Sequence, residues 1–308
     1  MTTQTENYQL ISLVGPTAVG KTACALALAK ELDTEIISAD SRQFYREMNL
    51  GTAKPTAKEL SEVPHHFINS HSVQEEYDVG TYEREALLVI NNLFAKGMHP
   101  ILVGGSGLFV DAICRGLDEL PPKDPAIRQS LNQQYHEQGL THLLDELKVK
   151  DADYFQEVDQ ANPQRIIRAL EVIRSTGQPF SFYRQNRPTP RPFRVISIGL
   201  DMPRERLYRR IDDRMDDMIA KGLFEEAKAL FPFRHLNALQ TVGYKEIFNF
   251  FEGAYDKSEA VRLLKRNSRR YAKRQLTWFR KNTNTHWFHP EAVDEIKTFV
   301  LSNLSKTP

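Results

Sequence analysis

The chain has 308 residues, a formal net charge of +1, and 41% hydrophobic and 26% charged residues, which is an ordinary globular balance. A net charge this close to zero does not indicate a nucleic-acid partner, so any RNA-binding surface must come from local clustering of Lys and Arg residues. Two cysteines, Cys24 and Cys114, are too few for a Cys₄ or Cys₃His zinc site, and no run of about 18 apolar residues predicts a membrane span. The N-terminus is polar and carries no signal pattern, so we expect a cytoplasmic protein with reduced, buried thiols.

Strands and helices alternate in the first third of the chain. Short apolar runs predict strands at 8–15, 34–40 and 99–107, and helical periodicity predicts helices at 21–32 and 82–97. This alternation indicates an α/β fold with a P-loop NTPase-like core, in which helices flank a parallel sheet. Ligands bind such sheets beyond the carboxyl ends of the strands. Three chemical features fall at these ends: "GPTAVGKT", "ADSRQ" and "GGSG".

The segment from Gly15 to Thr22 fits the phosphate-loop pattern G-x-x-x-x-G-K-[ST] between a strand and a helix. Its backbone N–H groups and the following helix N-terminus form an anion site. Lys21 adds a positive charge, and the Thr22 hydroxyl can reach a magnesium ion directly or through water. The pattern is also that of ATP- and other nucleotide-binding proteins.

Asp40 closes the second predicted strand, close to the expected phosphates. A carboxylate there can bind magnesium or accept a proton. It can equally be the N-cap of a following helix. The position alone does not choose between these roles.

The third strand ends in Gly104, Gly105, Ser106 and Gly107 instead of a magnesium-binding acid. Three glycines allow another backbone or a nucleotide to approach closely, or they form a tight turn without a ligand. No acid follows an apolar run elsewhere in the core, unlike the usual arrangement of a P-loop NTPase.

Proline clusters mark an all-helical insertion domain at 115–191 within a core formed by 1–114 and 192–308. A strand at 194–201 returns the chain to the sheet, and a long helix is predicted at 204–222. In the insertion, Ile166, Ile167, Leu170 and Ile173 form an apolar stripe. Arg165 and Arg168 lie off that stripe, on a solvated face or in contact with phosphate.

The segment 261–281 is strongly basic, and aromatic residues Tyr271, Trp278 and Phe279 are interleaved with its charges. Such a helix suits contact with an RNA backbone and base stacking, although a solvated helix with core-facing aromatics fits as well. Its basic residues are Arg262, Lys265, Arg266, Arg269, Arg270, Lys273, Arg274, Arg280 and Lys281.

These motifs in their order resemble one family, the tRNA dimethylallyltransferases or tRNA isopentenyltransferases (IPP transferases), in their bacterial form. The resemblance covers nearly the whole chain and rests on "GPTAVGKT", "ISADSRQFY", "LGTAKPT", "VPHHFINSHSVQEEYDVGTYEREA", "LVGGSGLF", "NPQRIIRALEV", "VGYKE" and "AKRQLTWFRK". Ser106 and Phe109 depart from the usual GGTGLY, and Val19 stands where a small residue is usual. Compared with the Thr and Tyr of the usual pattern, Ser106 keeps the hydroxyl group and Phe109 lacks it. Val19 should affect the packing of the loop only.

The resemblance implies transfer of a dimethylallyl group from dimethylallyl diphosphate to N6 of the adenosine 3′-adjacent to the anticodon (position 37). The tRNAs would be those reading codons that begin with U. Asp40 would be the general base, and Lys21 and Thr22 would assist catalysis with Mg²⁺. The diphosphate would bind Gly15, Pro16, Thr17, Ala18, Val19, Gly20, Lys21, Thr22 and Arg214, with Arg209 and Arg210 as alternatives to Arg214.

The resemblance also implies that the anticodon stem-loop of a tRNA is the partner of a protein that we expect to be monomeric and not membrane-bound. The adenosine would be flipped out of the loop to reach the donor. The expected tRNA contacts are Asp40, Ser41, Arg42, Gln43, Ser106, Arg128, Gln164, Arg165, Ile166, Ile167 and Arg168.

Three alternatives stay open from the sequence. A P-loop nucleotide or small-metabolite kinase would turn over ATP. A non-catalytic RNA-binding module would bind tRNA without transferring an alkyl group. An adenylate isopentenyltransferase would act on a free nucleotide, but the helical insertion and the basic segment favour a macromolecular acceptor.

Overall fold

The computed structural model describes residues 8–185 and 189–305. The chain divides into two compact units. The first comprises Met1–Cys114 and Arg191–Pro308, and the second comprises Arg115–Pro190. Residues 186–188 of the expected insertion lie outside the described residues. The two units are described in turn.

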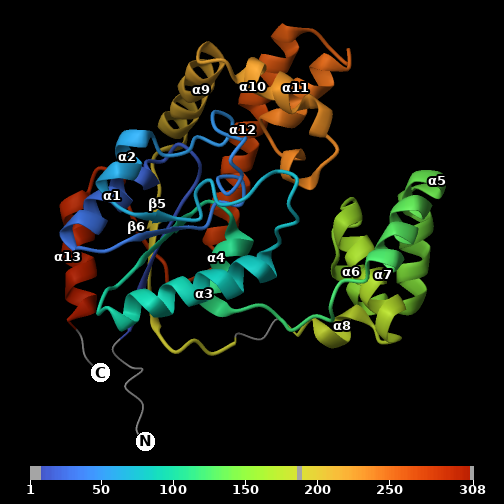
Figure 1. The fold of residues 1–308 in the computed structure, drawn as a ribbon, viewed down its shortest axis with the longest axis horizontal. Helices are drawn as coiled ribbons and strands as arrows, with labels where there is room; N and C mark the ends of the chain where they lie inside the picture. Colours follow the sequence, from blue (N-terminus) through green and yellow to red (C-terminus); the bar gives the residue numbers. More distant parts are fainter. Residues whose placement is uncertain (1–7, 186–188, 306–308) are drawn as a thin grey trace, which may run out of the picture. The chain divides into compact units, whose positions relative to one another are not determined.

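The first unit is built on a parallel sheet of six strands in the order β3-β2-β4-β1-β5-β6 (Figure 1). The predicted α/β fold with a parallel sheet is therefore confirmed. Since β2, β4 and β1 are neighbours, the three segments that follow them meet at one edge of the sheet. The strands are β1 (Gln9–Val14), β2 (Ile36–Ser38), β3 (His65–His66), β4 (Ile101–Gly104), β5 (Arg194–Leu200) and β6 (His286–Phe288).

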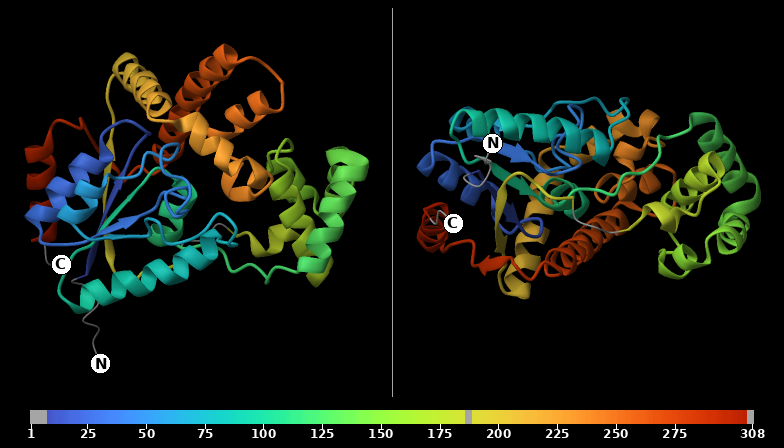
Figure 2. Two further views of the ribbon diagram at one scale, coloured as in Figure 1. Left: turned by 45° about the horizontal axis from the view of Figure 1, so that its top comes forward. Right: turned by 90° about the horizontal axis from the view of Figure 1, so that it is seen from below.

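Helices cover both faces of the sheet (Figure 2). One face packs against α1 (Lys21–Glu31), α9 (Arg204–Ala220) and α13 (Val293–Leu304). The other packs against α3 (Val79–Ala95) and α4 (Gly107–Arg115). Because both faces are covered, all six residues of the central strand β1 are buried, including Gln9 and Ser12.

A third hydrophobic cluster of this unit, beside those on the two faces of the sheet, joins α9 to the helices that follow it. The Glu226 carboxylate accepts hydrogen bonds from the backbone N–H groups of Asn49, Leu50 and Gly51 and from the Tyr244 hydroxyl. This carboxylate fixes the "LGTAKPT" loop to the "VGYKE" segment. The remaining elements are α2 (Ala57–Glu62), α10 (Leu223–Leu230), η2 (Phe231–Phe233), η3 (Asn237–Leu239), α11 (Tyr244–Phe251) and α12 (Lys257–Phe279).

The second unit contains α5 (Pro125–Lys150), α6 (Ala152–Glu157), α7 (Pro163–Thr176) and α8 (Phe180–Tyr183). Its described residues outside these helices form no strand, as the sequence predicted. Its core includes the apolar stripe of α7, with Ile166 and Leu170 fully buried. Gly139, at φ +79°, interrupts α5, which a left-handed glycine permits. None of the described helices combines the length and the apolar character needed to cross a bilayer.

Gly104 at the end of β4 and the glycines at 105 and 107 that follow it are explained by close packing within the protein. A Cβ at position 104 would lie less than 3.0 Å from the backbone of Ala39. Added Cβ atoms at Gly105 and Gly107 would come equally close to the side chains of Gln275 and Trp278. The sequence allowed either another part of the chain or a nucleotide to approach these glycines closely. In the structure, another part of the chain approaches them.

Gly104→Ala tests this packing. We expect the free energy of unfolding to fall by about 1–3 kcal/mol, because the added methyl group must displace the Ala39 backbone. Gly80→Ala is the matched control in α3, where the nearest atom would lie at an ordinary 3.6 Å. That change should be neutral or stabilising by up to about 1 kcal/mol. Urea unfolding followed by circular dichroism compares the two, and equal stability of both variants would contradict the steric account.

Candidate active site

The phosphate loop joins β1 to α1, as the sequence predicted. Gly15 and Gly20 adopt positive φ angles of +154° and +113°. Gly20 is the N-cap of α1. Because glycine has no side chain, the cap residue makes no side-chain hydrogen bond to the backbone N–H groups of the first helical turn. These N–H groups and the positive end of the helix dipole make the loop suited to an anion.

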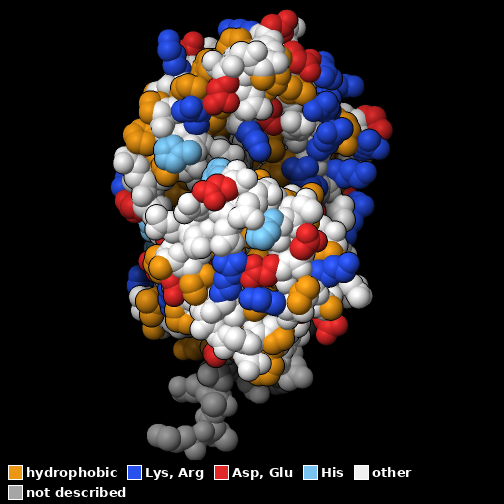
Figure 3. Space-filling model, turned by 90° about the vertical axis from the view of Figure 1, so that its right-hand side faces the viewer, with side chains coloured by type: hydrophobic (Ala, Val, Ile, Leu, Met, Phe, Trp, Pro, Cys, Tyr) orange, Lys and Arg blue, Asp and Glu red, His pale blue; other side chains and the backbone are white. Residues whose placement is uncertain are grey.

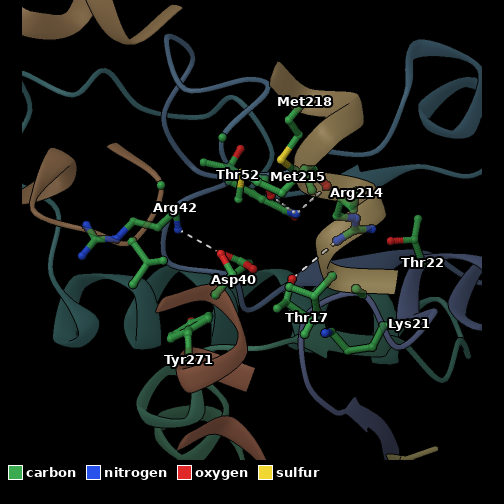
Figure 4. Close-up of a pocket in the computed structure, with 18 of the residues that line it drawn as sticks. Thr17, Lys21, Thr22, Asp40, Arg42, Thr52, Arg214, Met215, Met218 and Tyr271 are labelled. Carbon is green, nitrogen blue, oxygen red and sulfur yellow. Dashed lines mark hydrogen bonds between the residues drawn. The ribbon is translucent and has the colours of Figure 1, made fainter. Parts of the chain in front are cut away.

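A pocket of about 300 Å³ lies at the carboxyl ends of β1 and β2 (Figure 4). Several loops of the first unit, together with α9 and α12, contribute to its wall. Both charged and apolar side chains line it, a combination typical of small-molecule sites. The lining residues include Thr17, Ala18, Gly20, Lys21, Thr22, Asp40, Arg42, Gln43, Thr52, Glu59, Arg210, Ile211, Arg214, Met215, Met218, Val242, Ser268, Tyr271 and Gln275.

Lys21 lies at the base of this pocket. Its ammonium donates to the carbonyls of Gly15, at 3.0 Å, and Pro16, at 2.8 Å. Burial lowers the pKa of Lys21 to about 8, an effect that nearby Asp40 opposes and Arg214 reinforces. The site therefore concentrates positive charge that an anionic ligand would stabilise.

Arg214 projects from α9 toward the phosphate loop (Figure 4). Its Nη1 atom lies 3.5 Å from the Thr17 hydroxyl, at the limit of hydrogen bonding. Burial lowers the pKa of Arg214, and the neighbouring Arg210 adds to the effect. Arg210 also lines the pocket, whereas Arg209 is not among its lining residues. The structure thus brings two of the three candidate arginines to the site.

Asp40 faces the pocket two residues after β2. Its Oδ1 atom accepts a hydrogen bond from the backbone N–H of Arg42, at 3.1 Å. The N-cap interpretation is wrong, because the chain turns here and the next helix begins only at Ala57. Burial raises the pKa of Asp40, while the Arg42 N–H and Lys21 act in the opposite direction. A carboxylate with a raised pKa is better matched to accepting a proton near neutral pH.

The segment after Asp40 holds loops together as well as lining the pocket. The Arg42 side chain donates to the carbonyls of Asn237 and Ala238, and the Gln43 amide donates to those of Thr52 and Ala53. Arg42 and Gln43 also line the pocket. These side chains connect the floor of the site to the loops that enclose it.

Ser106 belongs to the turn after β4 and contacts the segment after β2. Its hydroxyl accepts from the Ser41 N–H and donates to the Ser41 hydroxyl, each at 3.0 Å. Ser41 and Ser106 are not among the lining residues of the pocket. The hydroxyl that Ser106 retains therefore has a partner within the protein.

Sequence reasoning assigned no role in the site to several residues that the structure brings there. Met215 and Met218 come from α9, and Tyr271 and Gln275 come from α12. Burial raises the pKa of Tyr271 to about 12, and Asp40 contributes to this shift. The signal for Gln275 was its place in the motif "AKRQLTWFRK", which carried the family resemblance but had no assigned chemistry, and Tyr271 was noted only as one of the aromatic residues interleaved in the basic segment.

In the second unit, two of the expected tRNA-binding residues pair with one buried acid. Glu171 is fully buried and accepts hydrogen bonds from Arg128, at 3.2 Å, and Arg168, at 3.0 Å. Gln164 and Arg165 are exposed at the start of α7. The side chains of Ile166 and Ile167 are buried in the core of this unit, so they are not available to RNA. tRNA contact at these two positions therefore stays a prediction that cannot rest on their side chains.

The basic charge of α12 and the residue after it is partly neutralised by one acid of the same helix and three acids from elsewhere in the chain. Ion pairs join Arg262 to Glu259, Lys265 to Asp216, Arg269 to Asp212 and Arg280 to Asp201. Arg270, Lys273 and Arg274 are exposed, and no ion pair engages them within the described residues. Lys and Arg side chains gather on part of the molecular face in Figure 3.

The two cysteines are separate thiols in the first unit. Cys24 is buried, and Cys114 is partly exposed as a whole residue. Burial raises the pKa of each thiol to about 12. Neither side chain lines the pocket.

Comparisons with known proteins agree with the geometry. A family model described as IPP transferase matches residues 43–282. A tRNA dimethylallyltransferase of Cytophaga hutchinsonii is 49% identical over 300 residues, covering 97% of this chain and 99% of the relative. A tRNA dimethylallyltransferase 1 of Porphyromonas gingivalis is 48% identical, with 94% and 96% covered. The crystal structure of a tRNA isopentenylpyrophosphate transferase from Bacillus halodurans has a TM-score of 0.70 and 39% identity, with 97% of each chain covered.

Proposed function

The chain belongs to the IPP transferase family, and we propose that its pocket transfers a dimethylallyl group from dimethylallyl diphosphate to N6 of a tRNA adenosine. The acceptor is the adenosine 3′-adjacent to the anticodon in tRNAs that read codons beginning with U. One observation carries the assignment of chemistry to this pocket. A phosphate loop and a carboxylate of raised pKa, Asp40, share a single cavity.

The reaction forms a bond between N6 and C1 of the five-carbon chain and breaks the bond between C1 and the diphosphate oxygen. Asp40 accepts the proton from N6, whose lone pair is otherwise drawn into the purine ring. Lys21, Arg214 and the loop N–H groups stabilise the charge that develops on the departing diphosphate. The other carboxylate of the pocket, Glu59, is held in the capping box of α2 by two hydrogen bonds from Thr56 to its Oε2 atom.

A magnesium ion fits this arrangement. The described residues contain no group of three or more His, Cys, Asp or Glu side chains placed to hold a metal. Mg²⁺ that binds through substrate phosphates needs only one or two protein ligands. Thr22, which lines the pocket at the start of α1, would hold the ion directly or through water. When bound, the ion would neutralise charge on the diphosphate.

The tRNA is proposed to contact both units. In the first unit, Asp40, Arg42 and Gln43 line the cavity that would receive the flipped adenosine. In the second, Arg128, Arg165 and Arg168 are the candidates for phosphate contact. We propose that the enzyme is a monomer and that it acts in the cytoplasm, where unmodified tRNA is available.

Incubation with labelled dimethylallyl diphosphate and unmodified tRNA tests this function. We expect label to appear in tRNA, at the adenosine after the anticodon, and to depend on magnesium. Parallel reactions contain AMP as acceptor or ATP alone. Transfer to AMP but not to tRNA would support an adenylate isopentenyltransferase, and tRNA-stimulated ATP turnover without alkyl transfer would contradict the proposal.

Neutralising Lys273 and Arg274 together should weaken tRNA binding without changing the choice of adenosine. For each phosphate that the protein no longer neutralises, the slope of log affinity against log salt becomes shallower by about 0.7–0.9. Binding measured at several salt concentrations checks this. Arg262→Gln is the control, because Arg262 lies on the same helix but is paired with Glu259. An unchanged salt slope in the double variant would show that this face of α12 is only solvated.

A further inference from the structure

Gln275 projects from α12 and contacts the phosphate loop. Its side chain is buried, at 5% exposure. Its Oε1 atom accepts a hydrogen bond from the Thr17 N–H, at 2.8 Å, and its Nε2 atom donates to the Gly105 carbonyl, also at 2.8 Å. Because both ends of the carboxamide are bonded, its orientation is fixed.

The space around this carboxamide is tightly filled. A Cβ at position 105 would lie less than 3.0 Å from Nε2 of Gln275, and 3.7 Å from the Lys21 ammonium nitrogen. Gly105 does not have a positive φ angle, so the absence of a side chain is needed there for space. The carboxamide, the glycine and the Lys21 side chain therefore share one closely packed region.

The contacts of Gln275 continue toward the proposed general base. Gly105 directly follows Gly104, the last residue of β4, which packs on the backbone of Ala39. The Ala39 N–H donates to the Val103 carbonyl, at 2.7 Å, and Ala39 directly precedes Asp40. One side chain from α12 thus connects the loop that would hold the donor to the segment that carries the carboxylate.

We propose that Gln275 is a positioning residue for the transfer reaction. Its carboxamide bridges the phosphate loop and the turn after β4, and it thereby fixes the diphosphate and Lys21 relative to Asp40. This inference rests on the proposed function. A displacement of about 1 Å between reacting groups can reduce a rate by about 10²-fold, so the bridge has a measurable effect on the chemical step.

Gln275→Ala and Gln275→Glu test the bridge. The glutamate variant keeps the shape and can accept from Thr17, but it cannot donate to Gly105. We expect the single-turnover rate constant, at saturating donor and tRNA, to fall by about 10–10²-fold in both variants. tRNA affinity should change little. Thr277→Ala, at an exposed position on the same helix, is the control and should react normally.

Gly105→Ala provides an independent variant and a double-mutant cycle. Its methyl group should displace the carboxamide and reduce the rate as Gln275→Ala does. In the Gln275→Ala background it should cause no further loss, because the side chain it would displace is absent. Losses that multiply in the double variant would show that the two positions act separately and would overturn the inference.

The amplitude of the single turnover separates positioning from simple stabilisation. A purely structural role predicts a lower Tm and a smaller reacting fraction with a normal rate constant, and that result would overturn the inference. Unaffected Gln275 variants beside an active wild-type enzyme would also overturn it. A wild-type enzyme that binds donor and tRNA without transfer would overturn the proposed function and, with it, this inference.

Discussion

Lys21→Ala is expected to reduce the rate of dimethylallyl transfer by about 10²–10³-fold. The variant removes a fixed positive charge from a site in which burial has already lowered the pKa of the lysine to about 8. That charge faces the diphosphate while its bond to C1 breaks. Single-turnover transfer of labelled donor to unmodified tRNA measures the loss, and a near-normal rate would contradict the proposed role of the loop.

The same pKa predicts how donor binding to the free enzyme depends on pH. The ammonium form binds the diphosphate, and this form predominates below the pKa of about 8. Donor affinity attributable to Lys21 should therefore be constant below pH 8 and fall as the pH rises through 8. Lys21→Arg is the matched control, since arginine stays charged over this range and should remove the dependence.

Asp40→Asn is expected to lower the rate of the chemical step by about 10²–10⁴-fold. Asparagine keeps the size of the side chain and can still accept the hydrogen bond from the Arg42 N–H that fixes this turn. Only the charge and the basicity are lost. Because general-base catalysis belongs to the chemical step, donor affinity should change little. Single-turnover kinetics beside a donor-binding titration measure the two effects separately.

The controls for Asp40 separate the remaining interpretations. Asp40 raises the pKa of Lys21, so its removal favours the neutral lysine, and the titration belongs below pH 8. If Asp40 were a magnesium ligand, donor affinity would collapse together with the rate. If it only shaped the turn, the asparagine variant would react almost normally, and Asp40 would have no part in the mechanism.

The sheet and the loops at its edge could be predicted because their signals are local. A phosphate-loop motif between an apolar run and an amphipathic helix predicts a loop between a strand and a helix. In a parallel sheet of this strand order, Asp40 and the glycine turn lie at the same edge as that loop. The glycines were read correctly as points of close approach. The groups that approach them are Ala39 and two side chains of α12. These contacts join segments up to about 170 residues apart, and no local sequence pattern predicts them.

The charges of α12 illustrate the same limit. The segment reads as uninterrupted basic sequence, yet Asp212 and Asp216 of α9 neutralise Arg269 and Lys265 across the packed helices. Periodicity placed Ile166 and Ile167 in an apolar stripe, and this local signal was right. The family resemblance had placed the same two residues against RNA, and their burial shows that packing determines their side chains.

The position of β1 at the centre of the sheet has a consequence for how the chain is made. β1 is the first strand to leave the ribosome, but one of its two neighbours, β5, begins 180 residues after β1 ends, at Arg194. The segment Arg115–Pro190 is continuous, precedes β5 in the chain and has its own hydrophobic core of helices. We therefore expect the inserted helices to fold during synthesis before β1 can pair with β5.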